Sequence, residues 1–130
     1  MANLYEKYHG DVNFLLVYTI EAHPIGSKSP YADEEWVSLW NSIPGVLIPQ
    51  HTHFDERLAT AQQSKTELGA FYQYPYVVDD LNNSVWQSYG VAASPGFLID
   101  QTGRIVLRQT WINPYAIDQK LAKMLSPCGN

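Results

Sequence analysis

The fold is decided by residues 96–108, which read GFLIDQTGRIVLR. Two apolar runs flank a short polar segment that ends in Gly103. Glycine is the residue that most readily adopts the positive φ angle of a tight turn. The pattern therefore predicts a β-hairpin over residues 96–108, with an antiparallel strand pair at this end of the sheet.

The segments before the hairpin alternate between strand and helix patterns. Residues 13–20 are almost continuously apolar, which is typical of a parallel strand buried on both faces. A second short strand is predicted over residues 76–79. Helices are predicted over residues 2–8, 33–40, 54–68 and 82–89. In the helix over residues 54–68, the expected buried face is formed by Phe54, Leu58, Ala61 and Leu68, with Gly69 after its end.

The segment after the hairpin predicts a last helix. Asn113 fits the N-cap position and Pro114 the first helical turn. Its expected buried stripe is Ile117, Leu121, Met124 and Leu125. The complete order predicts an α/β fold in which helices flank one mixed sheet, formed as a single domain over residues 1–130.

Composition excludes several classes of function. The 130 residues carry a formal charge of −5 and only eight lysines and arginines, without a basic run, so a nucleic-acid surface is not expected. The longest apolar run is far shorter than a membrane span, so no membrane partner is expected. With no targeting segment recognised, the cytoplasm is the default compartment.

The cysteine and histidine content limits the chemistry of the chain itself. Cys128 is the only cysteine, so an internal disulfide and a Cys-x-x-Cys redox pair are excluded. It follows Pro127 near the end of the chain, and an inert thiol is the expectation. A metal site formed by His51, His53 and His23 is an alternative that lacks an acidic or thiolate ligand nearby. Without a glycine-rich phosphate loop either, no cofactor is predicted.

The residues around the hairpin resemble the signature of the thioredoxin fold. The stretch Val91-Ala92-Ala93-Ser94-Pro95-Gly96-Phe97 precedes the hairpin turn as it does in that fold. The resemblance implies that Pro95 is the cis-proline that faces the active-site thiol, and a cis X–Pro bond is energetically accessible. The alternative is an ordinary proline at the entry of a strand.

Two further segments resemble the iodothyronine deiodinase family. Val17-Tyr18-Thr19-Ile20-Glu21-Ala22-His23-Pro24 is similar to the family's strand ending in Tyr-x-x-Glu-Ala-His-Pro. Ile48-Pro49-Gln50-His51, followed by Asp55-Glu56-Arg57-Leu58, is similar to its second histidine block and the helix after it. Both segments occur in the family's order, and the resemblance covers roughly residues 4–125.

The resemblance implies roles for individual side chains. Members of the family reduce an aromatic iodide with a selenocysteine, or a cysteine in bacterial relatives, that attacks the halogen. Tyr18, Glu21 and His23 match the polar relay that delivers a proton, and His51 and Pro95 match substrate-binding positions. An imidazole titrates near neutral pH, which suits proton delivery. The alternatives are a packed tyrosine, a solvated glutamate and hydrogen-bonded loop histidines.

Three features depart from the family pattern. The first core strand and the segment that carries the nucleophile are expected to be missing, which leaves the domain incomplete at its N-terminal side. Gly96 stands where vertebrate members carry an arginine, and residues Tyr31 to Val46 resemble an insertion. Since the missing strand would be central, we expect a homodimer, a strand-supplying partner or a rearranged sheet.

Two classes of function follow. The first is a deiodinase-like oxidoreductase domain of thioredoxin type that acts on a small aromatic or thiol substrate. This chain is expected to be inactive alone because it lacks the nucleophile. The second is a non-catalytic thioredoxin-like module for binding or assembly. An upstream strand followed by cysteine or selenocysteine would favour the first class.

Overall fold

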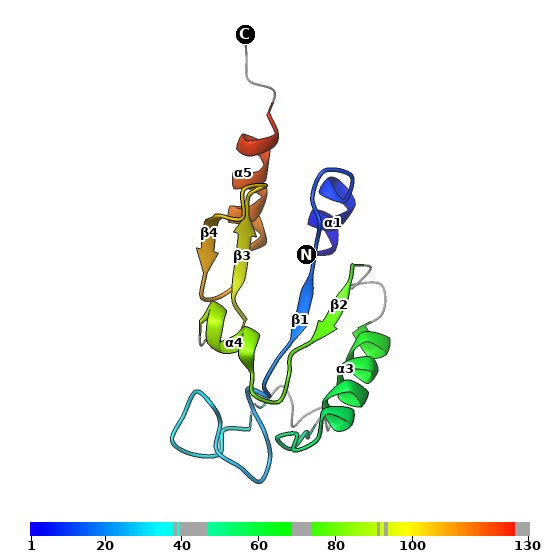
Figure 1. Cartoon of the computed structure of the whole chain (residues 1–130), viewed down its shortest axis with the longest axis vertical. Coiled ribbons are helices and arrows are strands. Elements are labelled where there is room, and N and C mark those ends of the chain that lie inside the picture. Colours follow the sequence, from blue (N-terminus) through cyan, green and yellow to red (C-terminus); the bar gives the residue numbers. More distant parts are fainter. Residues whose placement is uncertain (38, 40–46, 69–73, 91, 93, 127–130) are drawn as a thin grey trace. The chain divides into compact units, whose positions relative to one another are not determined.

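The computed structural model describes residues 1–37, 39, 47–68, 74–90, 92 and 94–126. Within them the chain is an α/β protein, as predicted (Figure 1). The elements in chain order are α1 (Ala2–Tyr8), β1 (Leu16–Tyr18), α3 (Phe54–Leu68), β2 (Tyr76–Val78), α4 (Ser84–Tyr89), β3 (Gly96–Ile99), β4 (Ile105–Gln109) and α5 (Pro114–Leu125).

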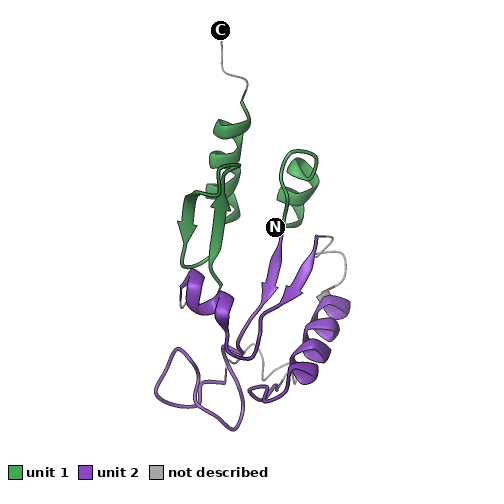
Figure 2. Cartoon of the chain, viewed as in Figure 1, with its two compact units in different colours: residues 1–14, 92–130 green, residues 15–91 purple. Residues whose placement is uncertain are grey.

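The chain divides into two compact units (Figure 2). Unit 1 comprises residues 1–14 and 92–130, and unit 2 comprises residues 15–91. The strands form two separate two-stranded sheets, β3–β4 in unit 1 and β1–β2 in unit 2. The predicted single mixed sheet is therefore not formed among the described residues. A thioredoxin-type sheet joins such pairs through a central strand, and no described segment pairs with both. The single-domain assignment stays a prediction.

The hairpin of unit 1 forms where the sequence predicts it. β3 and β4 are antiparallel, with Leu98 opposite Leu107 and an irregularity between Leu98 and Ile99. Gly103 in the turn has a φ of 82°. The Asp100 carboxylate accepts hydrogen bonds from the backbone N–H groups of Thr102 at 2.9 Å and Arg104 at 3.0 Å. The turn is thus stabilised by glycine's conformational freedom and by an aspartate that caps its N–H groups.

The core of unit 1 is apolar and joins α1, β3 and α5. Its buried residues are Leu4, Tyr8, Leu98, Ile117 and Leu121. The one polar atom that Tyr8 brings, its hydroxyl, donates to the Asp118 carboxylate at 2.7 Å. Lys7 forms an ion pair with the same carboxylate at 2.6 Å. Residues from both ends of the chain therefore share one core.

Helix α5 begins as predicted but buries a shorter stripe. The Asn113 side chain accepts from the backbone N–H groups of Tyr115 and Ala116, which confirms the cap. Ile117 and Leu121 are buried, whereas Met124 and Leu125 are 41% and 42% exposed. The predicted stripe is wrong in its last turn. The buried core cluster includes Ile117 and Leu121 of this helix but neither Met124 nor Leu125.

Strand β1 is shorter and less buried than predicted. It covers Leu16–Tyr18 instead of residues 13–20 and pairs in parallel with β2. All three residues are half-buried, and Leu15 before them is 61% exposed. A parallel strand is buried on both faces only when neighbours flank it and helices cover it. Among the described residues, β2 is the only strand that pairs with β1.

Helix α3 has the predicted bounds, but its buried residues differ. Ala61 is buried at 1% exposure, whereas Phe54 is 43% exposed. The inward position one turn before Ala61 is taken by Arg57, which is 2% exposed. The Arg57 guanidinium reaches backbone carbonyls beyond β2, and those hydrogen bonds explain its burial. The Leu68 side chain and Gly69 lie outside the described residues.

Two shorter predictions also meet different outcomes. A helix is expected over residues 33–40. Residues 33–37 instead form turns and irregular backbone, and Leu39 is helical. Residues 38 and 40–46 lie outside the described residues. The Glu34 carbonyl accepts from the Ser29 N–H at 3.0 Å, so this part of the chain folds back as a loop. Helix α4 ends at Gly90, as predicted.

The prediction that Pro95 follows a cis peptide bond is wrong. All the peptide bonds that the structure describes are trans, and that between Ser94 and Pro95 is among them. The trans form of an X–Pro bond is favoured by about 0.5–1 kcal/mol unless surrounding contacts oppose it. Here the Ser94 carbonyl accepts from the Ile112 N–H at 2.9 Å, which is compatible with the trans form.

In the described part of the chain, no helix is both long and apolar enough to cross a lipid bilayer.

Candidate functional site

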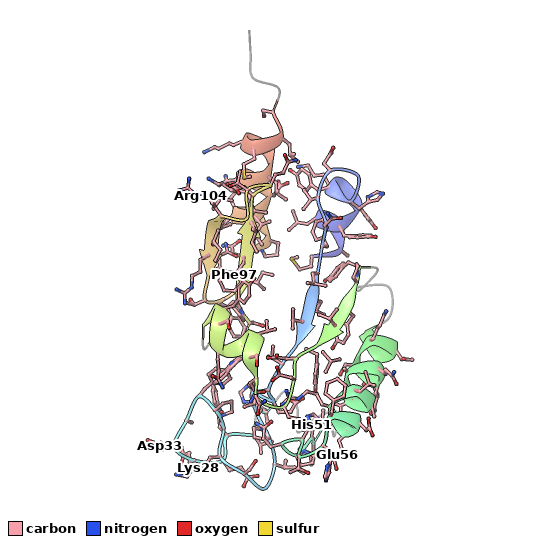
Figure 3. The ribbon with its side chains drawn as sticks, in the orientation of Figure 1. Lys28, Asp33, His51, Glu56, Phe97 and Arg104 are labelled. Carbon is pink, nitrogen blue, oxygen red and sulfur yellow. The ribbon has the colours of Figure 1, made fainter. Side chains whose placement is uncertain are left out.

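Three of the five predicted site residues meet at the end of β1. The Tyr18 hydroxyl donates a hydrogen bond to the Glu21 carboxylate. The rings of Tyr18 and His51 lie with their centroids 6.2 Å apart at an interplanar angle of 58°. Figure 3 shows His51 close to the N-terminal end of α3, near Glu56. Tyr18, Glu21 and His51 are called the relay cluster below.

Backbone pairing brings the two motifs together. The Gln50 side chain exchanges two hydrogen bonds with the backbone of Glu21: it accepts from the N–H at 3.2 Å and donates to the carbonyl at 2.9 Å. Four residues further on, the Ile25 N–H donates to the Ile48 carbonyl at 3.0 Å. Segments 21–25 and 48–51 therefore lie side by side, which places His51 next to the end of β1.

Glu21 has the most strongly perturbed acid–base chemistry of the cluster. Burial raises the pKa of its carboxyl to about 7, because the ionised form loses its hydration, while the charge of Arg57 acts in the opposite direction. Protonated and ionised forms therefore coexist near neutral pH. A carboxyl in this condition can give or accept a proton at little energetic cost.

The hydrogen bonds of His51 define which ring nitrogen carries its proton. Its Nε2 lies 2.9 Å from the Thr60 hydroxyl, and that hydroxyl donates its own hydrogen to the Glu56 carbonyl at 3.1 Å. We therefore assign the proton to Nε2, which donates to Thr60. The Nδ1 atom is buried and has no hydrogen-bond partner among the described residues. In this tautomer Nδ1 carries a lone pair.

The charge state of His51 agrees with this assignment. Burial lowers the pKa of the imidazole, and the Arg57 charge lowers it further, while Glu56 raises it. Glu56 also accepts from the backbone N–H groups of Thr52 at 3.0 Å and His53 at 3.1 Å. These bonds satisfy N–H groups at the start of α3, as the glutamate of a capping box does. They fix the segment that carries His51.

His23 lies in a different environment from the relay cluster. Its Nδ1 is 2.9 Å from the Trp36 carbonyl oxygen, and its ring meets the Trp36 ring edge-on at a centroid distance of 4.4 Å. A carbonyl can only accept, so Nδ1 carries a hydrogen and Nε2 is the reactive nitrogen. Within the described residues His23 forms no hydrogen bond to Tyr18, Glu21 or His51. The proton relay over Tyr18, Glu21 and His23 stays a prediction.

The remaining predicted position, Pro95, belongs to unit 1. The neighbouring Gly96 has limited space, because a Cβ atom there would lie 3.1 Å from the Ile112 side chain. Such a contact is tighter than most, so an arginine at position 96 would require Ile112 to move. Gly96, which stands where vertebrate members carry an arginine, therefore lies at a closely packed start of β3.

The metal alternative finds no support in the described part of the chain. No group of three histidine, cysteine, aspartate or glutamate side chains there is arranged to hold an ion. His53 is exposed on the surface, and His51 is engaged by Thr60.

Sequence reasoning missed four residues that organise the site: Gln50, Arg57, Thr60 and Trp36. Gln50 and Arg57 stand inside the quoted motifs, so their position beside His51 was visible. Thr60 is nine residues after His51, and only the start of a helix at Phe54 brings the two together. The contact of Trp36 with His23 depends on a loop whose path no local pattern predicts.

The chain matches one protein family and several curated relatives. The Iodothyronine deiodinase family matches residues 1–120. Type II iodothyronine deiodinase of Petromyzon marinus is 28% identical over 103 residues, covering 79% of this chain and 31% of the relative. Thyroxine 5-deiodinase of Ovis aries is 31% identical over 110 residues, covering 79% and 30%. Thyroxine 5-deiodinase of Sus scrofa is 29% identical over 138 residues, covering 91% and 37%.

The chain thus spans about a third of the length of these relatives. The family match covers most of the chain, including both histidine motifs and the hairpin. Together with the relatives, it shows that this chain belongs to the iodothyronine deiodinase family.

Proposed function

We propose that this chain contributes the proton-transfer and substrate-orienting part of a reductive dehalogenation site, built on a thioredoxin-like fold. The substrate class is a halogenated phenol. The attacking thiol or selenol belongs to a segment or partner outside these 130 residues, so the chain alone is expected to be inactive. Support comes from the family membership, which carries deiodinase-like function at the family level.

The chemistry assigned to the site is a two-electron reduction. A thiolate or selenolate attacks the halogen, and the carbon–halogen bond breaks with its electron pair left on the ring carbon. A proton then bonds to that carbon. The sulfenyl or selenenyl halide formed is reduced by a second thiol, which releases halide and leaves a disulfide or selenosulfide. The thiols supply both electrons, and the protein has to supply the proton.

The observation that carries the proposal is the relay cluster. It places a carboxyl that titrates near neutral pH next to a phenol hydroxyl, with a buried imidazole lone pair close by. We assign two roles. His51 Nδ1 accepts the hydrogen of the substrate hydroxyl, and Glu21 supplies a proton through Tyr18. His23, with Nε2 as its reactive nitrogen, is assigned the delivery of the proton to the ring.

Binding of 2-iodophenol to the chain at pH 7 tests this assignment. The NMR signals of the His51 imidazole report the binding. The methyl ether, 2-iodoanisole, has no hydroxyl hydrogen to donate. We expect the phenol to bind at least tenfold more tightly than the ether, and His51→Gln to remove that preference. His53→Gln is the matched control, because His53 is exposed two residues away.

Equal binding of phenol and ether would contradict the role of His51. Turnover is tested by iodide release from 2-iodophenol with dithiothreitol, in a Cys128→Ser background that leaves the reagent as the only thiol. Iodide release that depends on His23 and Glu21 supports the enzymatic function. If iodophenol does not bind at all, the non-catalytic binding or assembly module becomes the better assignment.

The partner proposal rests on the two separate strand pairs. Among the described residues, β1 pairs with β2, and β3 pairs with β4. A thioredoxin-type sheet joins two such pairs through a central strand, and we propose that a second copy or another partner supplies that strand. Light scattering of the purified chain tests the second copy: a dimer supports it as the source of the strand, and a stable monomer at all concentrations contradicts it.

A further inference from the structure

A threonine of α3 connects the helix to the histidine of the relay cluster. The Oγ1 atom of Thr60 lies 2.9 Å from Nε2 of His51, and the same oxygen lies 3.1 Å from the backbone carbonyl oxygen of Glu56. A hydroxyl has one hydrogen and two lone pairs. It therefore donates to only one of these two neighbours, and that choice decides which nitrogen of His51 carries the proton.

The place of Thr60 in the helix favours donation to Glu56. Threonine side chains in helices can return their hydrogen to the carbonyl four residues earlier. Thr66 in the same helix does so, with its Oγ1 atom 2.9 Å from the Gln62 carbonyl oxygen. A carbonyl can only accept, whereas an imidazole nitrogen can donate or accept. All three groups are satisfied when His51 donates to Thr60 and Thr60 donates to Glu56.

The other ring nitrogen of His51 offers nothing that opposes this arrangement. Its Nδ1 is buried and has no hydrogen-bond partner among the described residues, so no acceptor there holds a hydrogen on it. Burial lowers the pKa of the imidazole, so the ring is neutral at pH 8. A neutral ring carries one hydrogen, and the contacts of Thr60 place that hydrogen on Nε2.

We propose that Thr60 is a positioning residue of the site: its hydroxyl holds the His51 hydrogen on Nε2 and thereby makes Nδ1 the acceptor for a ligand hydroxyl. The inference deepens the proposed function, on which it rests for the identity of the ligand. Thr60 acts through His51. It makes the site select ligands that donate a hydrogen, because a ligand that can only accept would face the Nδ1 lone pair.

The hydroxyl and the methyl group of Thr60 can be tested separately. Thr60→Val keeps the branched shape and removes the hydroxyl, whereas Thr60→Ser keeps the hydroxyl and removes the methyl group. If the hydrogen bond sets the His51 tautomer, only the valine variant changes it. If Thr60 merely packs beside His51, only the serine variant changes it. The two roles therefore predict opposite outcomes.

The measurement is the nitrogen-15 NMR spectrum of the His51 imidazole in the full chain at pH 8, without ligand. The chemical shifts distinguish a nitrogen that carries a hydrogen from one that carries a lone pair. We expect Nε2 to carry the hydrogen in the natural chain and in Thr60→Ser. We expect Thr60→Val to lower the ratio of the Nε2–H to the Nδ1–H tautomer about fivefold, because a typical hydrogen bond contributes about 1 kcal/mol.

Thr66→Val is the matched control, because it removes a hydroxyl with the same helical hydrogen bond from an exposed position of α3. We expect it to leave the His51 spectrum unchanged. A natural ratio in Thr60→Val, or a ratio lowered in Thr60→Ser, would overturn the proposal. If Thr60→Val does not fold, the other two chains decide. A hydrogen on Nε2 in the natural chain and in Thr60→Ser supports the proposal, and a hydrogen on Nδ1 in either overturns it.

Binding then tests the selection of the ligand. In Thr60→Val, the preference for 2-iodophenol over 2-iodoanisole should fall by about the same factor of five. An unchanged preference together with the altered tautomer would overturn the selection by Thr60. The tautomer is measured without ligand, so its failure is separable from that of the proposed function. If the tautomer changes as expected and iodophenol does not bind, the dehalogenation site is rejected and the control of His51 by Thr60 stands.

Discussion

The two units of this chain have different interiors. Unit 1 is held by an apolar cluster from α1, β3 and α5, with Leu121 only 2% exposed. The buried polar residues of the described chain, Ser29, Arg57 and Asp79, all belong to unit 2. Apolar burial stabilises without directional requirements, whereas buried polar groups need partners. Unit 1 is therefore organised for stability, and unit 2 contains the groups suited to chemistry.

The largest expected effect tests the apolar side of this comparison. Leu121→Ala in unit 1 should lower the free energy of unfolding by about 2–5 kcal/mol, because it removes buried methyl groups and leaves a cavity. Urea denaturation followed by circular dichroism measures the change. Leu125→Ala is the matched control, since Leu125 is 42% exposed on the same helix. Similar losses in the two variants would argue against the packing described for α5.

The second prediction concerns pH and unit 2. Glu21 has its pKa raised to about 7 in the folded state, so ionising it costs stability. The contribution of Glu21 to the free energy of unfolding is fully present below pH about 4.5, and it is lost as the pH rises to about 7. Glu21→Gln cannot ionise but can still accept from Tyr18. Relative to the natural chain, the variant should gain stability with rising pH, by on the order of 3 kcal/mol in total.

The measurement is urea denaturation of both proteins at half-unit steps between pH 4 and pH 8. The difference between the two proteins isolates Glu21, because His51, whose pKa is lowered, changes stability with the opposite slope in both. A difference that is constant with pH would show that Glu21 is not buried as described.

The smallest effects compare the two helix caps. Asp79 caps α4 from the end of β2 with a buried carboxylate, and Asn113 caps α5 locally. Asp79→Ala should cost about 2–3 kcal/mol, because hydrogen bonds to a buried charged group are lost. Asn113→Ala should cost about 1 kcal/mol, as usual for an N-cap. Thermal unfolding measures both, and a larger loss for Asn113→Ala would reverse the comparison.

Local patterns predicted the elements whose determinants lie within a few residues. The turn at Gly103 needs a positive φ angle, and the start of α5 needs Asn113 and Pro114, so both could be read from neighbouring positions. The motif around Tyr18 and Glu21 likewise predicted a polar pair at the end of a strand. Nothing local indicated that His23 would turn to Trp36, because that contact spans thirteen residues of loop.

Burial was harder to predict than secondary structure. The apolar pattern of α3 favoured Phe54, yet the inward position is taken by Arg57, because carbonyls from another segment accept its hydrogen bonds. The cis form expected at Pro95 failed for a related reason. The energy difference between the cis and trans isomers is small, so surrounding contacts determine which one forms. The two residues of the bond do not predict those contacts.

The sequence by itself determined the α/β class, the bounds of α1 and α3, the place of the hairpin and the family. Periodicity, turn residues and motifs act over short distances. Only the tertiary structure decided the chemistry of the candidate site. Pairing of segments 21–25 and 48–51 brings Glu21 and His51 together, and burial shifts their protonation. Desolvation and the field of Arg57 depend on distances in space, which a linear order of residues does not contain.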